Sequence, residues 1–294
     1  MAELPLVVVA DPIDPGALAT LRSGPCRVVD ASADAAHLGD QLAGAWGLVV
    51  RSRTKVTAEL IARAPRLALI ARAGVGLDNV DLRAARGRGI EVVNAPQAAT
   101  ASVAELTVAL YLILVRGLLP AIASTRAGRW ERGLHGHELA GRTVGFVGYG
   151  RIAREVARRL RPFDVRTLAH DPFVASVSDG TTLVPLAQLL AASDIVSLHA
   201  ALTEENHHLL DAAALASMRP GAFLVNVARG PLVDEAALVE ALRAGRLGGM
   251  APRWKPASGK RLLVHCPDGP TNAWRFQPPG RKEPPPPVGR ELHL

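Results

Sequence analysis

A glycine-rich turn followed by a carboxylate carries the clearest chemical signal in this 294-residue chain. Segment 148–153 reads Gly-Tyr-Gly-Arg-Ile-Ala, follows the apolar run 144–147 and opens a helical pattern. Gly148 permits a tight turn, and Gly150 lets the backbone approach a pyrophosphate at the helix N-terminus. Asp171 stands where a carboxylate can accept both ribose hydroxyls of NAD and repel the 2′-phosphate of NADP. The motif predicts an NAD site; the alternative is a glycine turn with a surface aspartate.

An arginine and a second glycine turn could hold anionic groups elsewhere in the chain. Arg229 follows a strand-like run, so it stands at the carboxyl edge where doubly wound sheets bind ligands. A guanidinium there can clamp a carboxylate and polarise an adjacent carbonyl. The turn Gly74-Val75-Gly76 exposes N–H groups that can hold an anion. Each has a plainer alternative, an exposed arginine at a strand end and an ordinary turn.

Short β-branched runs alternate with amphipathic helical stretches, which predicts two α/β domains with parallel sheets. Five strands are expected first, at residues 6–10, 27–30, 47–51, 68–72 and 91–94. A second set is expected at residues 143–147, 166–169, 195–199 and 223–227. A complete dinucleotide-binding sheet has about six strands. No strand pattern follows Gly249, so the second sheet is expected to be truncated.

One long helix is expected between the two sets of strands. It opens near Thr100, and Glu105 stands three residues after Ser102, which is the spacing of a capping box. The helical pattern can run to about Arg126. A helix of that length is typical of a strut between domains.

Charge and composition exclude several classes of protein. The formal charge of +7 belongs mostly to residues 251–294, which carry eight Lys or Arg and three acidic residues, and residues 1–249 hold +2. A basic balance confined to the tail gives no support to nucleic-acid binding. The longest apolar run, 106–115, is too short to cross a membrane. Cys26 and Cys266 form no disulfide framework, so a cytoplasmic location is expected.

The composition changes near Gly249-Met250. Residues 250–294 hold ten prolines, and three of the four lysines of the chain also lie there. Neither helical nor strand periodicity survives, so a disordered tail is expected over residues 250–294. Our hypothesis for this abrupt switch is a reading-frame change near Met250.

Taken together, the motifs of residues 5–249 resemble the D-2-hydroxyacid dehydrogenase family, and most of all its phosphoglycerate dehydrogenase branch. The segments that carry the resemblance are 50–57, 72–81, 94–96, 102–105, 148–153, Asp171 and 226–230. The resemblance implies a flavodoxin-like substrate domain over residues 1–97 and a Rossmann NAD-binding domain over residues 98–249. It also implies a homodimer, formed through the region 102–126.

The resemblance assigns a role to each matching residue. It implies that Arg229 orients a 2-oxo acid while the amides of Val75 and Gly76 receive the substrate carboxylate. Arg51 and Ser52 match the positions that hold a substrate phosphate. Contacts with NAD are implied for Gly148, Gly150, Arg151, Ile152, Asp171, Ala200, Val227 and Ala228. No metal is expected, because the chain has no ligand-spaced Cys/His cluster.

The chain departs from the family pattern after Gly249. Family members continue with a strand carrying an aspartate, then a glutamate, and later a proline–histidine pair that moves the hydroxyl proton. His265 and His293 lack the neighbours of that histidine. The chain as written is therefore expected to be weakly active or inactive. The alternative function is a non-catalytic NAD-binding protein, with the proline run 284–287 as a ligand for a partner.

Overall fold

The structure is a computed structural model, and it describes residues 3–133 and 136–252. The chain divides into two compact units, Met1–Ala104 and Glu105–Leu294. The expected disordered tail, apart from residues 250–252, lies outside the described residues, as do His265 and His293.

The first unit is built on a five-stranded parallel sheet with the order β2-β1-β3-β4-β5. Its strands are β1 (Leu6–Val9), β2 (Arg27–Asp30), β3 (Gly47–Val50), β4 (Leu69–Arg72) and β5 (Glu91–Asn94). All five coincide with expected strands to within one residue at each end. The order is that of flavodoxin-like sheets, so the predicted fold class of this unit is confirmed.

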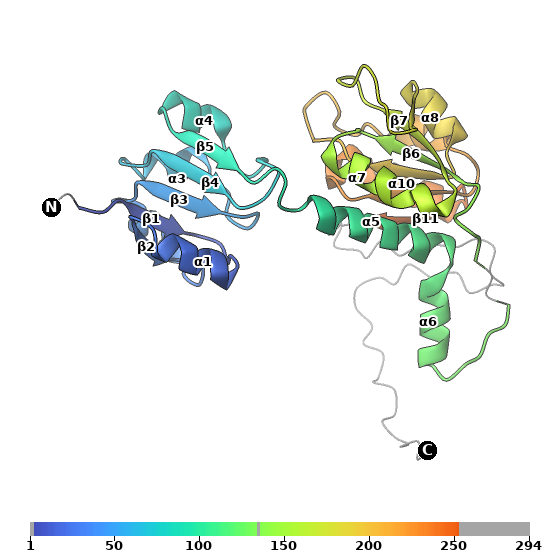
Figure 1. Cartoon of the computed structure of the whole chain (residues 1–294), viewed down its shortest axis with the longest axis horizontal. Helices are drawn as coiled ribbons and strands as arrows, with labels where there is room; N and C mark the ends of the chain where they lie inside the picture. The colour runs from blue at the N-terminus through green and yellow to red at the C-terminus, as the bar shows by residue number, and fades with distance from the viewer. Residues whose placement is uncertain (1–2, 134–135, 253–294) are drawn as a thin grey trace, which may run out of the picture. The chain divides into compact units, whose positions relative to one another are not determined.

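Short helices connect these strands (Figure 1). They are α1 (Pro15–Arg22), the 3₁₀ turn η1 (Ala35–His37), α2 (Leu38–Gln41), α3 (Ala58–Ala62) and α4 (Leu82–Gly87). The side chains of Asp14, Thr57 and Asp81 accept backbone N–H groups at the starts of α1, α3 and α4. Such caps satisfy donors that the first turn of a helix leaves unpaired.

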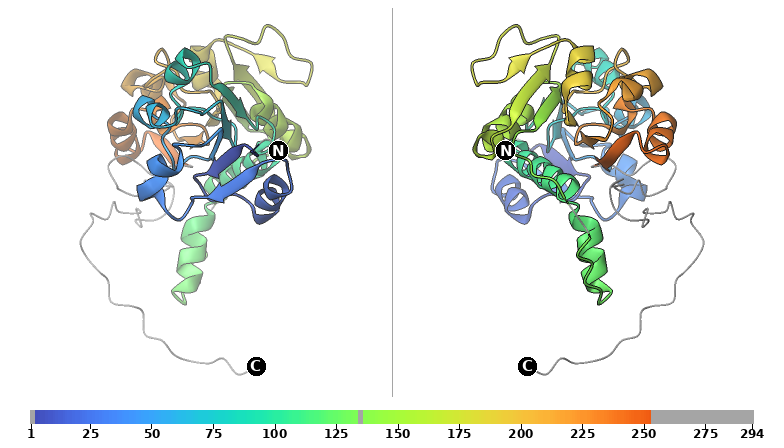
Figure 2. Two further views of the ribbon diagram at one scale, coloured as in Figure 1. Left: turned by 90° about the vertical axis from the view of Figure 1, so that its left-hand side faces the viewer. Right: turned by 90° about the vertical axis from the view of Figure 1, so that its right-hand side faces the viewer.

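The expected long helix is two helices, α5 (Thr100–Val115) and α6 (Leu118–Arg126), which meet at 72° (Figures 1 and 2). Gly117 lies between them with φ +58°, a left-handed conformation that ends α5. Ser102 lies inside α5, so the predicted capping box is wrong. In the described part of the chain no single helix could span a membrane, although this bent pair has sufficient length and apolar character.

The second unit holds a six-stranded parallel sheet with the order β11-β10-β9-β6-β7-β8. Its strands are β6 (Thr143–Val147), β7 (Arg166–His170), β8 (Thr182–Leu183), β9 (Ile195–Leu198), β10 (Ala222–Asn226) and β11 (Leu247–Pro252). The order is that of a Rossmann sheet, which confirms the predicted class. The expected count of four strands is wrong. The two further strands are β8, which has only two residues, and β11, which pairs with β10 as far as Pro252.

Helices and 3₁₀ turns connect the strands of the second unit, and an apolar core lies among them. They are α7 (Arg151–Leu160), η2 (Arg161–Phe163), α8 (Leu186–Ala192), α9 (Ala212–Ser217), η3 (Gly230–Leu232) and α10 (Glu235–Arg243). Leu224 of β10, Leu238 of α10 and Met250 of β11 are all fully buried in this core. Met250 is therefore part of the folded unit, and the predicted change of structure at residue 250 is wrong for residues 250–252.

Candidate functional site

The turn between β6 and α7 has a backbone shape that requires glycine at its first position. Gly148 has φ +85°, and a Cβ atom there would lie 2.6 Å from the backbone nitrogen of Ala200. The N–H group of Gly148 donates to the carbonyl of His170 at 2.8 Å. The turn is therefore held between the carboxyl ends of β7 and β9, the two neighbours of β6 in the sheet.

The second glycine of the turn leaves open space at the N-terminus of α7. A Cβ atom on Gly150 would meet no heavy atom within 4 Å. Gly150 is also the N-cap residue of α7, and no side chain caps this helix. The first N–H groups of the helix, including those of Arg151 and Ile152, thus keep their capacity to bind an anion. An open cradle at a helix N-terminus fits a pyrophosphate.

Asp171 contacts this turn directly. It follows β7, and its carboxylate accepts hydrogen bonds from the N–H groups of Tyr149 at 2.7 Å and Phe173 at 2.9 Å. The bond to Tyr149 joins the carboxylate to the middle residue of the glycine turn. A carboxylate beside a phosphate cradle is the arrangement that accepts ribose hydroxyls in dinucleotide sites. The residues present therefore fit a dinucleotide.

The Tyr149 side chain, to which the sequence patterns assigned no role, ties the turn to the segment before β8. Its ring is fully buried against Phe146. Its hydroxyl donates to the Asp179 carboxylate at 2.8 Å and lies 2.6 Å from the Thr181 hydroxyl. Desolvation raises the pKa of Tyr149 to about 12, so the hydroxyl stays protonated. A tyrosine between two turn glycines after a buried strand is the signal that could have revealed this contact.

His199 and Ala200 follow β9 on the other side of β6. The imidazole Nε2 of His199 lies 2.9 Å from the Ser197 hydroxyl, and its ring packs on Phe146. Its Nδ1 is buried and has no hydrogen-bond partner among the described residues. Burial lowers the pKa of His199 to about 3. The side chain is therefore a neutral imidazole near neutral pH, and it is a positioning group at most.

This buried imidazole predicts that acid weakens the fold. The unfolded chain protonates the histidine below about pH 6.5, whereas the folded chain resists protonation down to about pH 3. Between these values the unfolded state binds more protons than the folded state. The free energy of unfolding therefore decreases as the pH is lowered, by up to about 1.4 kcal/mol per pH unit. Urea unfolding at several pH values in this window is expected to show a shallower slope for His199→Phe than for the wild type. Equal slopes would contradict the prediction.

Asn226 closes the loop that carries Arg229. This buried residue ends β10, and its amide Nδ2 donates to the carbonyl of Arg229 at 2.8 Å while its Oδ1 accepts the N–H group of Ala228 at 2.9 Å. The Arg229 guanidinium donates to the carbonyl of Ala228 at 3.0 Å. Val227 is buried within the same loop. The loop therefore presents Arg229 at the carboxyl end of β10, next to β9.

In the first unit a buried aspartate shapes the loop of Arg51 and Ser52. Asp11 follows β1 and accepts the N–H groups of Arg51 at 2.6 Å and Arg53 at 3.2 Å, and the Thr54 hydroxyl at 2.7 Å. Burial acts to raise the pKa of Asp11, but these hydrogen bonds outweigh it and hold the pKa below its ordinary value. The sequence patterns missed Asp11; its position directly after a buried strand was the available signal.

Val75 and Gly76 lie at the same edge of the first sheet, because β4 pairs directly with β3. Gly74 opens their turn with φ +155°, and the Arg72 side chain occupies the space that a Cβ atom would need. The Asn94 side chain donates to the carbonyl of Val75 at 2.6 Å and fixes the turn.

The predicted site residues thus form two groups, one in each unit. Neighbouring strands bring together, in the first unit, Arg51, Ser52, Val75 and Gly76. In the second unit the carboxyl ends of β6, β7, β9 and β10 bring together Gly148, Gly150, Arg151, Ile152, Asp171, Ala200, Val227, Ala228 and Arg229. Among the residues that the structure describes, no cluster of His, Cys, Asp or Glu could hold a metal ion.

One flavodoxin-like unit and one Rossmann unit, the latter with an open glycine turn and an adjoining carboxylate, define a two-domain, dinucleotide-binding α/β protein. Residues 108–252 match the family model described as D-isomer specific 2-hydroxyacid dehydrogenase, NAD binding domain. The chain belongs to the D-isomer specific 2-hydroxyacid dehydrogenase family, and its cofactor is NAD. The resemblance inferred from the motifs is confirmed.

Relatives and solved structures agree with this assignment. The chain is 43% identical to an (S)-sulfolactate dehydrogenase of Chromohalobacter salexigens, over 83% of this chain and 81% of that protein. It is 44% identical to a D-3-phosphoglycerate dehydrogenase of Mycobacterium leprae, over 83% of this chain and 47% of that protein. The NAD-dependent formate dehydrogenase of Staphylococcus aureus, solved with NAD, is 32% identical with a TM-score of 0.78, over 86% and 82% of the two chains. The chain spans about half the length of the curated phosphoglycerate dehydrogenases that it matches.

Proposed function

We propose that this chain acts as an NAD-dependent oxidoreductase on the CH–OH group of a D-2-hydroxy acid, with 3-phosphoglycerate and phosphohydroxypyruvate as the substrate pair. The observation that carries the proposal is the hydrogen bond from the N–H group of Tyr149 to Asp171. It supports a ribose-binding role for Asp171, because the carboxylate contacts the turn whose Gly150 is open to a pyrophosphate.

Each group of site residues has one task in this proposal. Bound NAD supplies the hydride acceptor for the alcohol. The N-terminus of α7 binds the pyrophosphate, Asp171 accepts the ribose hydroxyls, and Ala200, Val227 and Ala228 border the cofactor. Arg229 clamps the carboxylate of the substrate and polarises its C2 oxygen.

The residues of the first unit bind the phosphate of the substrate and share its carboxylate with Arg229. The N–H groups of Val75 and Gly76 receive its carboxylate. Arg51 and Ser52 hold its phosphate, which is why a phosphorylated acid is proposed. The related (S)-sulfolactate dehydrogenase makes a sulfonated acid a further substrate to test.

In this proposal the transfer of the hydroxyl proton lacks an efficient general acid or base. The pKa of His199 is lowered to about 3, so its imidazole is neutral and supplies no imidazolium near neutral pH. No histidine of residues 250–294 has the neighbours of the family's proton-transfer histidine. Loss of a general acid or base costs about 10²- to 10⁴-fold in rate. We therefore propose that this chain turns over slowly, as a consequence of the changed sequence after Gly249.

Substitution of Asp171 tests the role proposed for its carboxylate. Asp171→Ser is expected to weaken NAD binding about 10-fold, because one charge-assisted pair of hydrogen bonds is lost. The preference for NAD over NADP is expected to become smaller. Fluorescence titration with NADH and NADPH measures both effects. Glu240→Ser, a change at an exposed carboxylate of α10, is the control. An unchanged NADH/NADPH ratio in Asp171→Ser would contradict the assignment.

Oxidation of NADH with phosphohydroxypyruvate, sulfopyruvate, glyoxylate and hydroxypyruvate tests the function as a whole. The assay compares the 294-residue chain with a version whose reading frame from about Met250 onward is restored to the family pattern. Fast turnover by the restored version alone would support a dehydrogenase impaired by its altered end. No turnover by either version, with NADH still bound, would favour the non-catalytic NAD-binding protein instead.

We also propose that the chain forms a homodimer through the region 102–126. The apolar side chains of Leu106, Leu118 and Ile122 are 39%, 39% and 47% exposed, and that of Trp130 is 80% exposed. Exposed apolar side chains on this pair of helices and on the segment that follows them support association with a second copy. Light scattering of the purified chain gives its mass directly, and a monomer at all concentrations would refute the dimer.

A further inference from the structure

The loop 171–179, which follows β7, is attached at both of its ends to one residue, Tyr149. The backbone N–H group of Tyr149 donates to the carboxylate of Asp171, at the start of the loop, at 2.7 Å. Its hydroxyl donates to the carboxylate of Asp179, at the end of the loop, at 2.8 Å. The glycine turn and this loop are therefore joined at two points, through opposite ends of the same residue.

Tyr149 is itself held firmly in place. Its carbonyl accepts a hydrogen bond from Nε of Arg154 at 3.2 Å, and the guanidinium of Arg154 lies over the tyrosine ring, 5.0 Å from the ring centroid. The ring is fully buried and packs on Phe146. These contacts fix the ring, so its hydroxyl is a rigid point of attachment for the far end of the loop.

The hydroxyl groups near Tyr149 form a chain with one direction. A carboxylate only accepts hydrogen bonds, so Tyr149 donates to Asp179 and accepts from the hydroxyl of Thr181, 2.6 Å away. The hydroxyl of Thr167, on β7, lies 3.0 Å from that of Thr181 and donates to it. Burial acts to raise the pKa of Asp179, but the hydrogen bonds from Tyr149 and Thr181 outweigh it and hold the pKa below its ordinary value. The chain thus ends on an ionised carboxylate, and charge-assisted bonds of this kind are strong.

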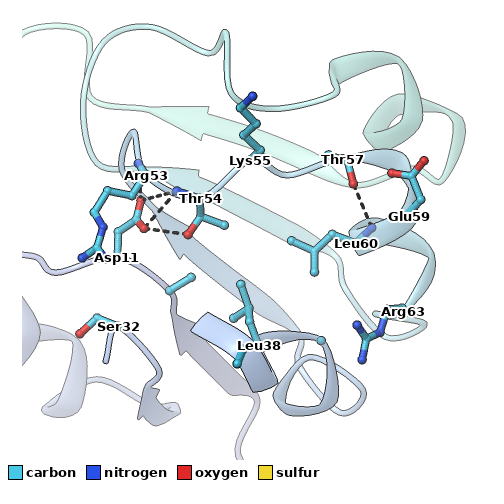
Figure 3. A pocket seen from close by; sticks show the side chains of 13 residues that line it. Asp11, Ser32, Leu38, Arg53, Thr54, Lys55, Thr57, Glu59, Leu60 and Arg63 are labelled. Carbon is cyan, nitrogen blue, oxygen red and sulfur yellow. Dashed lines mark hydrogen bonds between the residues drawn. The ribbon is translucent and has the colours of Figure 1, made fainter. Parts of the chain in front are cut away.

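Asp171 depends on this support more than Asp11 does in the first unit. The Asp11 carboxylate accepts three backbone N–H groups and the hydroxyl of Thr54 (Figure 3), so its own bonds hold it. In the described part of the chain the Asp171 carboxylate accepts two hydrogen bonds, and one of them comes from Tyr149. A carboxylate has about four acceptor sites, so acceptor capacity remains for ribose hydroxyls. The position of Asp171 is therefore sensitive to the position of Tyr149.

We propose that Tyr149 is a positioning residue for the cofactor. By holding the loop 171–179 at both ends, it sets the place at which the Asp171 carboxylate meets the ribose hydroxyls. This role rests on the proposed function, in which Asp171 binds the ribose. The preference for NAD over NADP then depends on the Tyr149 hydroxyl, which is buried, and on its acceptor Asp179, eight residues from Asp171 in the sequence.

Tyr149→Phe removes the hydroxyl and keeps the ring, and fluorescence titration of the full chain with NADH and NADPH measures the effect. Affinity for NADH is expected to weaken about 3- to 10-fold, the equivalent of one hydrogen bond. Affinity for NADPH is expected to weaken less, because a carboxylate donates no hydrogen bond to a 2′-phosphate. The NADH/NADPH affinity ratio therefore falls, whereas a general distortion of the glycine turn would lower both affinities alike.

Tyr111→Phe is the matched control. Tyr111 is the other tyrosine of the chain, lies on α5 and is also fully buried, so the substitution removes the same group from the same kind of surroundings. The control is expected to keep the NADH/NADPH ratio of the wild type. An equal fall of the ratio in the control would overturn the role proposed for Tyr149.

Amide exchange in the absence of cofactor tests the attachment of the loop separately. The N–H groups of Phe173 and Thr181 donate to the carboxylates of Asp171 and Asp179. Their exchange is expected to become at least about 3-fold faster in Tyr149→Phe, because the hydroxyl no longer holds the loop. The control variant is expected to exchange at the wild-type rate. Unchanged exchange in Tyr149→Phe would overturn the proposal.

Substitutions of Asp179 provide a test by rescue. Asp179→Ala removes the acceptor of the Tyr149 hydroxyl, whereas Asp179→Asn keeps a polar partner, since an amide can accept from this hydroxyl or donate to it. The NADH/NADPH ratio of Asp179→Asn is expected to lie between those of the wild type and Asp179→Ala. The double variant Tyr149→Phe/Asp179→Ala is expected to lose no more than the larger single change, because both remove one contact. Additive losses, or no rescue by asparagine, would contradict the proposal.

The outcomes separate this role of Tyr149 from the proposed function. A ratio that falls in Tyr149→Phe and not in Tyr111→Phe supports the role. An unchanged ratio in Tyr149→Phe overturns it, and the dehydrogenase proposal stands if Asp171→Ser still changes the ratio. If Asp171→Ser also leaves the ratio unchanged, the ribose-binding role of Asp171 fails and the role of Tyr149 fails with it. Circular dichroism confirms that each variant is folded.

Discussion

Alanine at position 148 is expected to weaken NAD binding at least about 100-fold, or about 2.7 kcal/mol, and to lower the melting temperature. Gly148 has φ +85°, a conformation that costs an L-residue about 1–2 kcal/mol. The new Cβ atom would also lie 2.6 Å from the backbone of Ala200, so the end of β9 must move. Calorimetry and titration with NADH measure the two effects.

Gly150→Ala distinguishes cofactor binding from folding at the same turn. Gly150 has φ −82° and open space around the position of a Cβ atom, so the variant is expected to keep the melting temperature of the wild type. The methyl group would occupy the phosphate cradle, and NADH binding is expected to weaken about 10-fold. Gly133→Ala, also in open space and remote from the turn, is the control. Normal NADH binding by both turn variants would refute the location of the site.

Arg229→Met is expected to weaken binding of phosphohydroxypyruvate to the chain–NADH complex about 100-fold. Arg229→Lys is expected to weaken it about 10-fold. A guanidinium makes bidentate, charge-assisted bonds worth about 1.5–3 kcal/mol, and lysine keeps the charge without the fork. The Asn226 amide holds the loop through backbone contacts, so the fold should survive either change. Quenching of NADH fluorescence measures substrate binding without requiring turnover.

Binding of NADH is expected to stay unchanged in both Arg229 variants, because the guanidinium is proposed to contact substrate alone. Arg166→Met removes an exposed charge from β7 in the same unit and serves as the control. A similar loss of substrate affinity in that control would show that the effect is long-range electrostatics. A loss of NADH binding in Arg229→Met would show that this residue contacts the cofactor and not the substrate.

The strands with continuous β-branched or apolar runs were predictable, since burial in a parallel sheet leaves a direct pattern in the sequence. The four buried residues of β3 (Gly47–Val50) and the five of β6 (Thr143–Val147) are examples. Two strands gave no such pattern. β8 has only two residues, and β11 contains two glycines and a proline, so pairing with β10 overrides its weak local preference.

The break in the long helix was missed for a related reason. The apolar pattern continues past Gly117, whereas the left-handed backbone of this one glycine turns the chain by 72°. A single glycine in a helical pattern indicates a break only weakly, because many are tolerated.

The candidate site was predictable where a motif fixes the chemistry and not where tertiary contacts do. Gly148, Gly150 and Asp171 stand out by their spacing, and the structure brings them together. Asp11 and Tyr149 have no motif of their own. Their importance comes from hydrogen bonds to residues 43 and 30 positions away, which no local pattern records.

The bond between Tyr149 and Asp171 also restricts how this protein could evolve toward NADP. The fully buried Tyr149 donates its backbone N–H to the carboxylate that would have to be removed to admit a 2′-phosphate. Alanine at position 171 would leave that N–H without an acceptor, at a cost of about 1–3 kcal/mol. Serine or asparagine at position 171 keeps an acceptor for this N–H group. We therefore expect a change toward NADP to begin with one of these two residues. A substitution at position 171 thus changes cofactor preference and stability together.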